Sequence, residues 1–264
     1  GVFQLESSGM KQVLVGLQPQ NLEDVIALIS LYRPGPMDSI PTYLRNRHEP
    51  DKISYKTPQL AHILDVTNGC IVYQEQVMQI FRELAGFSFG QADNVRRAMS
   101  KKKHAVMEAE REHFVHGCTE PGHECPGCVA NGISEKVANE IYDEMSSFAS
   151  YAFNKSHAAC YAYVAFQTAY LKCHYPSEFM AALLTSVLDN TDKVIEYSGE
   201  CARLGIKVLP PDVNISNGGF TADDGKIRFG LNAVKNVGRN LIERVVEERK
   251  EKPYASLYDF CKRM

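Results

Sequence analysis

The stretch that decides the fold is FASYAFNKSHAACYAYVAFQTAYLKCHYP, residues 148–176. Its polar run at 154–157 leads into a segment, 158–170, that is apolar or aromatic except for Gln167 and Thr168. Apolar residues all round a helical repeat are typical of a helix that is buried on every side. The polar run would lie at the positive N-terminal end of this helix, where anions are favoured. A helix cap followed by a core helix explains the same pattern, so both interpretations stay open.

Composition sets wide bounds on the class of protein. The 264 residues leave room for one large or two modest domains, and the formal net charge of −3 argues neither for nor against a nucleic-acid partner. No apolar run approaches the roughly 20 residues that span a membrane, and no signal peptide is evident. The eight scattered cysteines favour a reducing, cytoplasmic setting over a disulfide scaffold. Both ends have the character of mid-sequence, so we expect an excised piece of a longer protein.

Periodicity predicts a mostly α protein. The predicted helices are two within 8–32, with Asn21 capping the second, further helical structure at 37–66, and helices at 74–84, 92–99, 105–116, 134–147, 177–188, 191–204 and 239–250. A short strand is expected at 70–73 and a β-hairpin at 220–231, around Asp224-Gly225. We therefore expect a large helical domain at 1–205 and a smaller, truncated α+β region at 206–264.

Two segments point to anion binding. Arg33-Pro34-Gly35-Pro36 stops the preceding helix, and it is either a rigid turn or a stiff loop that presents Arg33 to an anion. The cluster of Arg96, Arg97, Lys101, Lys102 and Lys103 is either a solvated basic face or a site for a polyphosphate or nucleic-acid backbone. An acidic segment follows the cluster directly, so its positive charge is local.

One cluster has the composition of a metal site. Cys125-Pro-Gly-Cys128 has the spacing with which a tight turn presents two thiolates to one ion, and Cys118 and His123 would complete a tetrahedral zinc site. All four candidate ligands fall in one short loop, which is unusual for structural zinc. A solvent-exposed insertion with a coincidental Cys-x-x-Cys is the alternative.

Near the C-terminal end, Val234-Lys-Asn-Val-Gly238 precedes a predicted helix. An apolar-x-x-apolar-Gly turn before a helix exposes backbone amides, and helix-hairpin-helix modules use this arrangement to hold phosphates without reading sequence. Lys235, Asn236 and Gly238 are therefore candidate DNA-backbone contacts.

Several of these stretches together resemble the alpha subunits of bacterial DNA polymerase III, the C family of replicative DNA polymerases. The matching segments are GVFQLES at 1–7, RPGP at 33–36, YQEQVMQI at 73–80, RRAM at 96–99, residues 148–182, and LPPDVN at 209–214. Their order over nearly the whole chain fits a fingers domain followed by the start of a helix-hairpin-helix region. The insertion at 118–128 departs from many family members.

The resemblance implies roles for particular residues. Arg96 and Arg97 would contact the β- and γ-phosphates of an incoming dNTP, and the neighbouring lysines would add positive potential for triphosphate (Lys101) or DNA (Lys102 and Lys103). Asn154, Lys155, Ser156 and His157 would lie beside the sugar and nascent base pair, with Ser156 or His157 excluding a ribose 2′-OH. Lys11 and Arg33 are lesser candidates for the same cleft. Gln74, Glu75 and Gln76 are interpreted as a scaffold that orients these groups.

The resemblance also implies cofactors and partners. Two Mg²⁺ ions would be held by palm aspartates, which in the family's order precede Gly1, so the chain alone is expected not to catalyse. The expected partners are primer-template DNA, dNTPs, the sliding clamp and other replisome subunits, with no membrane and a location at the nucleoid. Two alternatives are a free-standing nucleic-acid-binding module and a zinc-loop module that docks another replication protein.

Overall fold

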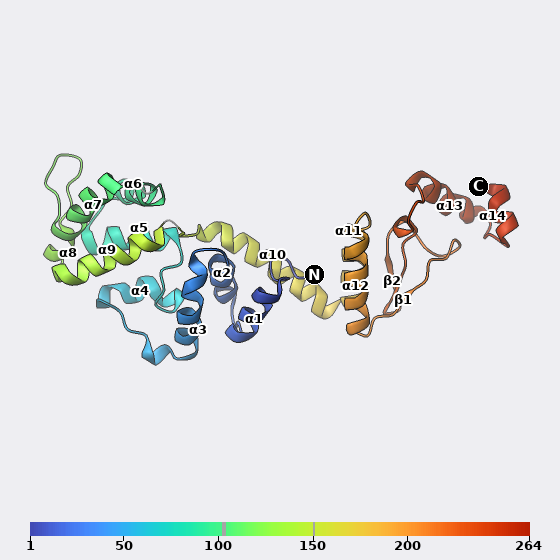
Figure 1. Cartoon of the computed structure of the whole chain (residues 1–264), viewed down its shortest axis with the longest axis horizontal. Coiled ribbons are helices and arrows are strands. Elements are labelled where there is room, and N and C mark those ends of the chain that lie inside the picture. Colours follow the sequence, from blue (N-terminus) through green and yellow to red (C-terminus); the bar gives the residue numbers. More distant parts are fainter. Residues whose placement is uncertain (102–103, 150) are drawn as a thin grey trace. The chain divides into compact units, whose positions relative to one another are not determined.

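The computed structural model describes residues 1–101, 104–149 and 151–264, and it confirms the prediction of a mostly α protein (Figure 1). The helices are α1 (Ser8–Leu17), α2 (Leu22–Leu31), α3 (Ile40–His48), α4 (Ala61–Leu64), α5 (Gln74–Ala85), α6 (Phe89–Ser100), α7 (His104–His116), α8 (Gly127–Ala130), α9 (Glu135–Ala149), α10 (Lys155–His174), α11 (Pro176–Ser186), α12 (Thr191–Arg203), α13 (Arg239–Glu251) and α14 (Leu257–Arg263). The strands are β1 (Val208–Leu209), β2 (Thr221–Asp223) and β3 (Lys226–Arg228).

The chain forms two compact units. We call Ser7–Val164 the helical unit, and Gly1–Glu6 together with Ala165–Met264 the sheet unit. The domain division expected after residue 205 stays a prediction.

The centre of the helical unit is α5, which α6, α7 and α9 surround (Figure 1). Val77 and Leu84 of α5 are completely buried. Phe81 meets Phe114 of α7 edge-on, with ring centroids 5.0 Å apart, and Tyr142 of α9 in the same way at 6.0 Å. Burial of each such side chain stabilises the fold by about 1.5–3 kcal/mol. This packing fixes α5, so the polar residues at its N-terminal end have defined positions.

Local sequence signals set the helix ends of this unit. The Asn21 side chain accepts a hydrogen bond from the amide of Asp24 at 2.9 Å, which confirms the predicted cap of α2. Ser88 and Gln91 form a reciprocal capping box at the start of α6. Gly86 ends α5 with a φ of 76°, a left-handed conformation that favours glycine.

The strand predicted at 70–73 does not form. Tyr73 makes only an isolated parallel bridge with Phe153. The side chain of Gln76, which is 4% exposed, accepts hydrogen bonds from the amides of both Val72 and Tyr73 at 2.9 Å. A buried side chain therefore satisfies backbone groups that a neighbouring strand would otherwise satisfy.

The sheet unit contains a three-stranded sheet of order β1-β3-β2, next to α11 and α12 (Figure 1). The predicted hairpin is confirmed: β2 pairs antiparallel with β3, and Asp224-Gly225 forms its turn. Strand β1 pairs parallel with β3, although the sequence predicted a linker from Leu209 onward. Beyond the sheet, α13 and α14 pack around a small core of Leu231, Ile242, Val245 and Tyr254.

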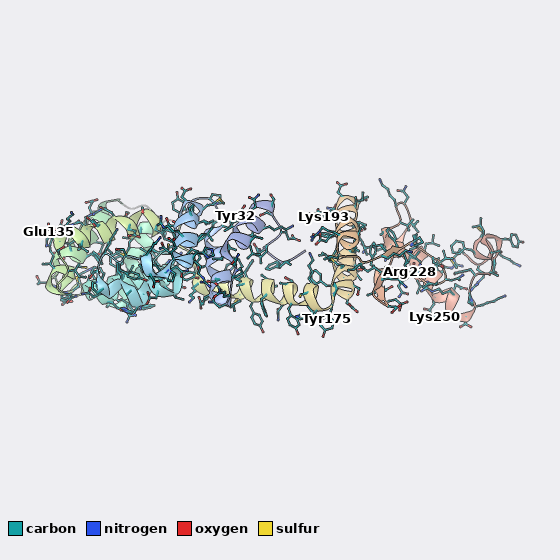
Figure 2. All side chains as sticks on the ribbon, turned by 90° about the horizontal axis from the view of Figure 1, so that it is seen from below. Tyr32, Glu135, Tyr175, Lys193, Arg228 and Lys250 are labelled. Carbon is teal, nitrogen blue, oxygen red and sulfur yellow. The ribbon has the colours of Figure 1, made fainter. Side chains whose placement is uncertain are left out.

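The prediction that the helix after residue 157 is buried on every side is wrong. Ala158 and Ala162 of α10 are completely buried, whereas Tyr163 and Phe166 are each 56% exposed. Tyr175, just beyond α10 and labelled in Figure 2, is 53% exposed. A hydrophobic pattern does not distinguish small from large apolar residues. In α10 the alanines form the buried face, and the large aromatic side chains lie on the exposed faces. Within the described residues, no helix is both long and apolar enough to cross a membrane.

Candidate functional site

The helical unit contains a cleft of about 480 Å³ formed by α5, α6 and the residue before α10. It is lined by Gln74, Glu75, Met78, Gln79, Arg82, Glu83, Phe89, Asp93, Arg96 and Asn154. Two of the residues predicted to bind nucleotide, Arg96 and Asn154, come together here from segments far apart in the sequence. The two residues therefore line one cleft, and their binding of a nucleotide stays a prediction.

Arg96 is held from two sides. Its Nε and Nη2 donate to Oδ1 of Asp93 at 3.0 and 2.7 Å, and its Nη1 donates to Oε1 of Gln74 at 2.9 Å. The side chain is 19% exposed. Hydrogen bonds from Arg96 hold the pKa of Asp93 below its usual value. The guanidinium is therefore fixed in one orientation by a charged partner and a neutral one.

Arg97 shares the same carboxylate. Its Nη2 lies 2.8 Å from Oδ2 of Asp93, and its side chain is 65% exposed. Arg97 does not line the cleft, but Asp93 connects it to Arg96. The two adjacent guanidinium groups are thus linked through one acid.

The start of α10 is occupied by the protein's own polar groups. The Asn154 side chain accepts a hydrogen bond from the amide of His157 at 2.9 Å, as a helix cap. The carboxylate of Glu75 accepts from the amide of Lys155 at 3.1 Å and from the Asn154 side chain at 3.2 Å. The anion that this helix end favours is therefore Glu75 in the present structure.

The remaining residues of this polar run differ in accessibility. The ammonium of Lys155 lies 3.0 Å from Oε2 of Glu23, so an acid already pairs with it. Ser156 and His157 are exposed, and the His157 ring lies 4.4 Å from that of Tyr161. Both side chains are accessible to a ligand, which their predicted role at a sugar requires.

Gln74 joins the two halves of the cleft. Its side-chain amide donates to the carbonyl of Ala152 at 3.0 Å, while its side-chain oxygen accepts from Arg96. Its backbone amide donates to the carbonyl of Phe153 at 2.9 Å. These contacts, with those of Glu75 and Gln76, fit the interpretation of residues 74–76 as a scaffold.

Other predicted nucleotide-binding residues lie apart from the cleft lining. Arg33 donates from Nε to the carbonyl of Ser30 at 2.9 Å, donates to the carbonyl of Tyr151, and stacks over the Phe153 ring, 4.3 Å from its centroid. These contacts support the rigid-turn interpretation. Lys11 on α1 and Lys101 at the end of α6 are exposed, and neither lines the cleft. Lys102 and Lys103 lie outside the described residues.

Asp93, Arg82 and Phe89 also line the cleft, although no sequence pattern indicated them. Asp93 precedes Arg96 and Arg97 by three and four residues on one helix. Side chains at this spacing meet on the helix surface, so the sequence alone could have predicted these two ion pairs. Phe89 and Arg82 carried no comparable signal. Their contact, with the guanidinium 5.8 Å from the ring centroid, joins two different helices.

The cysteine loop has a tight backbone structure. Cys118 and Cys125 form an antiparallel bridge with two backbone hydrogen bonds of 2.9 Å. Gly117 and Gly127 have φ angles of 89° and 79°, and a Cβ on Gly127 would lie 2.3 Å from the amide nitrogen of Gly117. Only glycine fits this close approach.

The predicted zinc site is not assembled. Cys128 is completely buried in the core, and burial raises the pKa of its thiol to about 12. The Cys125 thiol donates to the carbonyl of His113, while His123 is exposed. In the described part of the chain, no group of three or more His, Cys, Asp or Glu side chains is placed to hold a metal ion. The described residues therefore give the zinc prediction for Cys118, His123, Cys125 and Cys128 no geometric support, and both it and the zinc-loop alternative stay predictions.

In the sheet unit, Lys235, Asn236 and Gly238 are all exposed in the turn before α13. Asn236 has a φ of 65°, and Gly238 is the residue that caps α13. Val237 packs against the core of this region and anchors the turn. These three residues are therefore accessible from solvent, and their contact with a DNA backbone stays a prediction.

Comparison with known proteins decides the family. Residues 1–122 match the bacterial DNA polymerase III alpha subunit finger domain, and residues 205–264 match a helix-hairpin-helix motif. DNA polymerase III subunit alpha of Bacillus subtilis is 47% identical over 264 residues, which is 100% of this chain and 23% of the relative. The chain belongs to the family of bacterial DNA polymerase III alpha subunits.

Other relatives agree with this assignment. DNA polymerase III subunit alpha of Thermus aquaticus is 50% identical over 270 residues, covering 100% of this chain and 21% of the relative. That of Chlamydia trachomatis is 47% identical over 264 residues, covering 100% of this chain and 20% of the relative. The chain thus spans about a fifth of the length of the curated relatives it matches.

Proposed function

We propose that this chain is the finger part of a template-directed bacterial DNA polymerase and that its cleft binds the triphosphate of the incoming dNTP. The observation that carries this proposal is Arg96, an oriented and partly exposed guanidinium that lines a cleft of suitable size. Arginine forks suit phosphate oxygens because they offer several donors in a fixed plane. The finger-domain match and the polymerase relatives support the same role.

In this proposal, Arg96 and Arg97 stabilise negative charge on the β- and γ-phosphates as pyrophosphate leaves. Lys101 adds positive potential at the end of α6, with Lys102 and Lys103 following it in sequence. Arg33 has a lesser role in this proposal, because its guanidinium already donates to the carbonyls of Ser30 and Tyr151. Lys11 likewise has a lesser role on α1, away from the cleft lining. The protein's contribution is positioning and electrostatic stabilisation, which are its main means of assisting transfer at phosphorus.

The polar run of α10 is proposed to lie beside the sugar and the nascent base pair. Ser156 and His157 are exposed one turn from Asn154, which lines the cleft. His157 is the better candidate to exclude a 2′-OH, because its ring is supported by Tyr161. The ratio of dNTP to rNTP incorporation should fall when His157 is changed to Ala. An unchanged ratio would rule out this role.

Mg²⁺ has no fitting site among the described residues, where no cluster of three or more candidate ligands occurs. By the family resemblance, the Mg²⁺ ions of polymerisation are assigned to palm aspartates elsewhere in the longer polymerase. The chain alone is accordingly expected not to catalyse.

The turn before α13 is proposed to hold the DNA backbone. Its exposed residues Lys235, Asn236 and Gly238 and the helix-hairpin-helix match support this role. The proposed partners of the longer polymerase are primer-template DNA, the sliding clamp and other replisome subunits, at the bacterial nucleoid.

The test is Arg96→Ala in the full-length polymerase that carries this sequence. Loss of a charge-assisted contact costs about 1.5–3 kcal/mol, so kcat/KM for dNTP should fall about 10- to 100-fold. Arg82→Ala is the matched control, because Arg82 lines the same cleft but contacts the Phe89 ring. Equal losses in both variants, or no loss in Arg96→Ala, would exclude Arg96 as the phosphate contact.

A further inference from the structure

Asp93 lies between the two arginines and contacts both. Its Oδ1 is 2.7 Å from Nη2 of Arg96, and its Oδ2 is 2.8 Å from Nη2 of Arg97. Because hydrogen bonds from Arg96 lower the pKa of Asp93, this carboxyl is ionised at neutral pH. One carboxylate thus sets the spacing of two neighbouring guanidinium groups.

The same carboxylate opposes anion binding. The cleft is lined by three acids, Glu75, Glu83 and Asp93, and by two arginines, Arg82 and Arg96. A ligand with several negative charges is therefore repelled by Asp93 at the place where Arg96 attracts it. By this Coulombic argument, the affinity of the cleft for any polyphosphate would be higher without the Asp93 charge.

Asp93 also determines which donors of Arg96 reach a ligand. A guanidinium has five N–H groups. Asp93 and Gln74 accept three hydrogen bonds from Arg96, through Nε, Nη2 and Nη1. Because Asp93 and Gln74 fix the plane of the guanidinium, they also fix the directions of its remaining N–H groups. The direction in which Arg96 can bind a phosphate therefore depends on Asp93.

We propose that Asp93 is a positioning residue of the polymerase reaction, one that weakens ground-state binding of the triphosphate and fixes the arginines for the transition state. The inference rests on the proposed function of the cleft. It predicts an unusual combination: neutralising Asp93 should strengthen the binding of polyphosphates and slow the reaction. A residue that only stabilises the fold would instead raise KM and lower the melting temperature.

The test is Asp93→Asn in the full-length polymerase, measured by steady-state kinetics and by inhibition with inorganic pyrophosphate. We expect KM for dNTP and the inhibition constant of pyrophosphate to fall about threefold, since one partly exposed like charge is removed. We expect kcat to fall about 10- to 100-fold, because misorienting the groups that position the substrate lowers the rate by about this factor. The matched control is Glu83→Gln, which removes one charge from the same cleft, where Glu83 contacts His62 and Gln79.

The control should show the lower KM without the loss of kcat. If Asp93→Asn and Glu83→Gln behave alike, or if KM rises in Asp93→Asn as the melting temperature falls, the positioning role is overturned. Arg96→Ala separates this outcome from failure of the proposed function. A loss in Arg96→Ala with no specific effect of Asp93→Asn removes only the present inference, whereas no loss in Arg96→Ala removes both.

Discussion

The side-chain oxygen of Gln74 accepts a hydrogen bond from Nη1 of Arg96 at 2.9 Å. The amide end of the same side chain donates to the carbonyl of Ala152 at 3.0 Å. One neutral side chain at the start of α5 therefore connects a guanidinium on α6 to the segment that leads into α10. The proposed phosphate contact and the proposed sugar contacts are thus held in one framework.

Gln74→Met should disrupt this framework, because methionine has a similar shape and neither hydrogen bond. We expect KM for dNTP in the full-length polymerase to rise about tenfold, the effect of one hydrogen bond to a charged group. Gln74→Glu keeps an acceptor for Arg96 but loses the donor to Ala152 and adds a negative charge to the cleft, so its KM should rise by only about threefold.

Gln79→Met is the matched control, since Gln79 lines the same cleft and its side chain donates to Glu83. It should leave KM within about twofold of the parent, in the range of surface substitutions. Equal KM values for Gln74→Met and Gln74→Glu would show that the contact with Arg96 does not matter.

Acid stability should depend on Glu200 in the sheet unit. Hydrogen bonds from Arg203 and Lys172 lower the pKa of Glu200 from 4.5 to about 2. Because the folded-state pKa is depressed, the carboxylate stabilises the fold fully above about pH 4.5, and this contribution is lost as the pH falls toward about 2.

Glu200→Gln should therefore lower the free energy of unfolding by about 1–2 kcal/mol at neutral pH and by less at acid pH. Urea unfolding at a series of pH values measures this. Glu196→Gln is the control on the same helix, because Glu196 is 60% exposed and pairs with Lys193. The same pH dependence of unfolding in both variants would show that Glu200 has no special contribution to acid stability.

The thiols should differ in reactivity according to burial. Cys160 and Cys173 are exposed, whereas Cys128 is completely buried with a pKa raised to about 12. Since the thiolate is the reactive form, iodoacetamide should alkylate Cys160 and Cys173 in the folded chain and leave Cys128 unmodified. Mass spectrometry of peptides measures the labelling.

A chelator should not change this labelling pattern, because the structure assigns the protection of Cys128 to packing. Protection of Cys125 and Cys128 that disappears on adding a chelator would instead reveal a bound metal ion.

Much of the fold was predictable, because its helices carry local signals. Asn21 begins α2 as its side chain predicts, and Asp224-Gly225 forms the expected hairpin turn. The two wrong predictions, the strand at 70–73 and the fully buried helix after residue 157, depend on tertiary contacts. The Gln76 side chain, not a neighbouring strand, accepts the hydrogen bond from the Val72 amide. The burial of α10 depends on which of its faces other helices cover. A hydrophobic pattern contains neither fact.

The candidate site was predictable only in part. Arg96 and Asn154 were identified, and the structure brings them to one cleft. The sequence did not show that Lys155 is paired with Glu23 or that Arg33 stacks on Phe153. A residue type indicates what a side chain can bind, whereas its partners depend on segments that lie far away in the sequence.

In the proposed function, Arg96 contacts the terminal phosphates of a nucleoside triphosphate. The most direct measurement compares inhibition of the full-length polymerase by a dNDP and by an unreactive dNTP analogue, in the parent and in Arg96→Ala. The parent should prefer the triphosphate, and Arg96→Ala should lose about tenfold or more of this preference. An unchanged preference in Arg96→Ala would contradict the proposed contact.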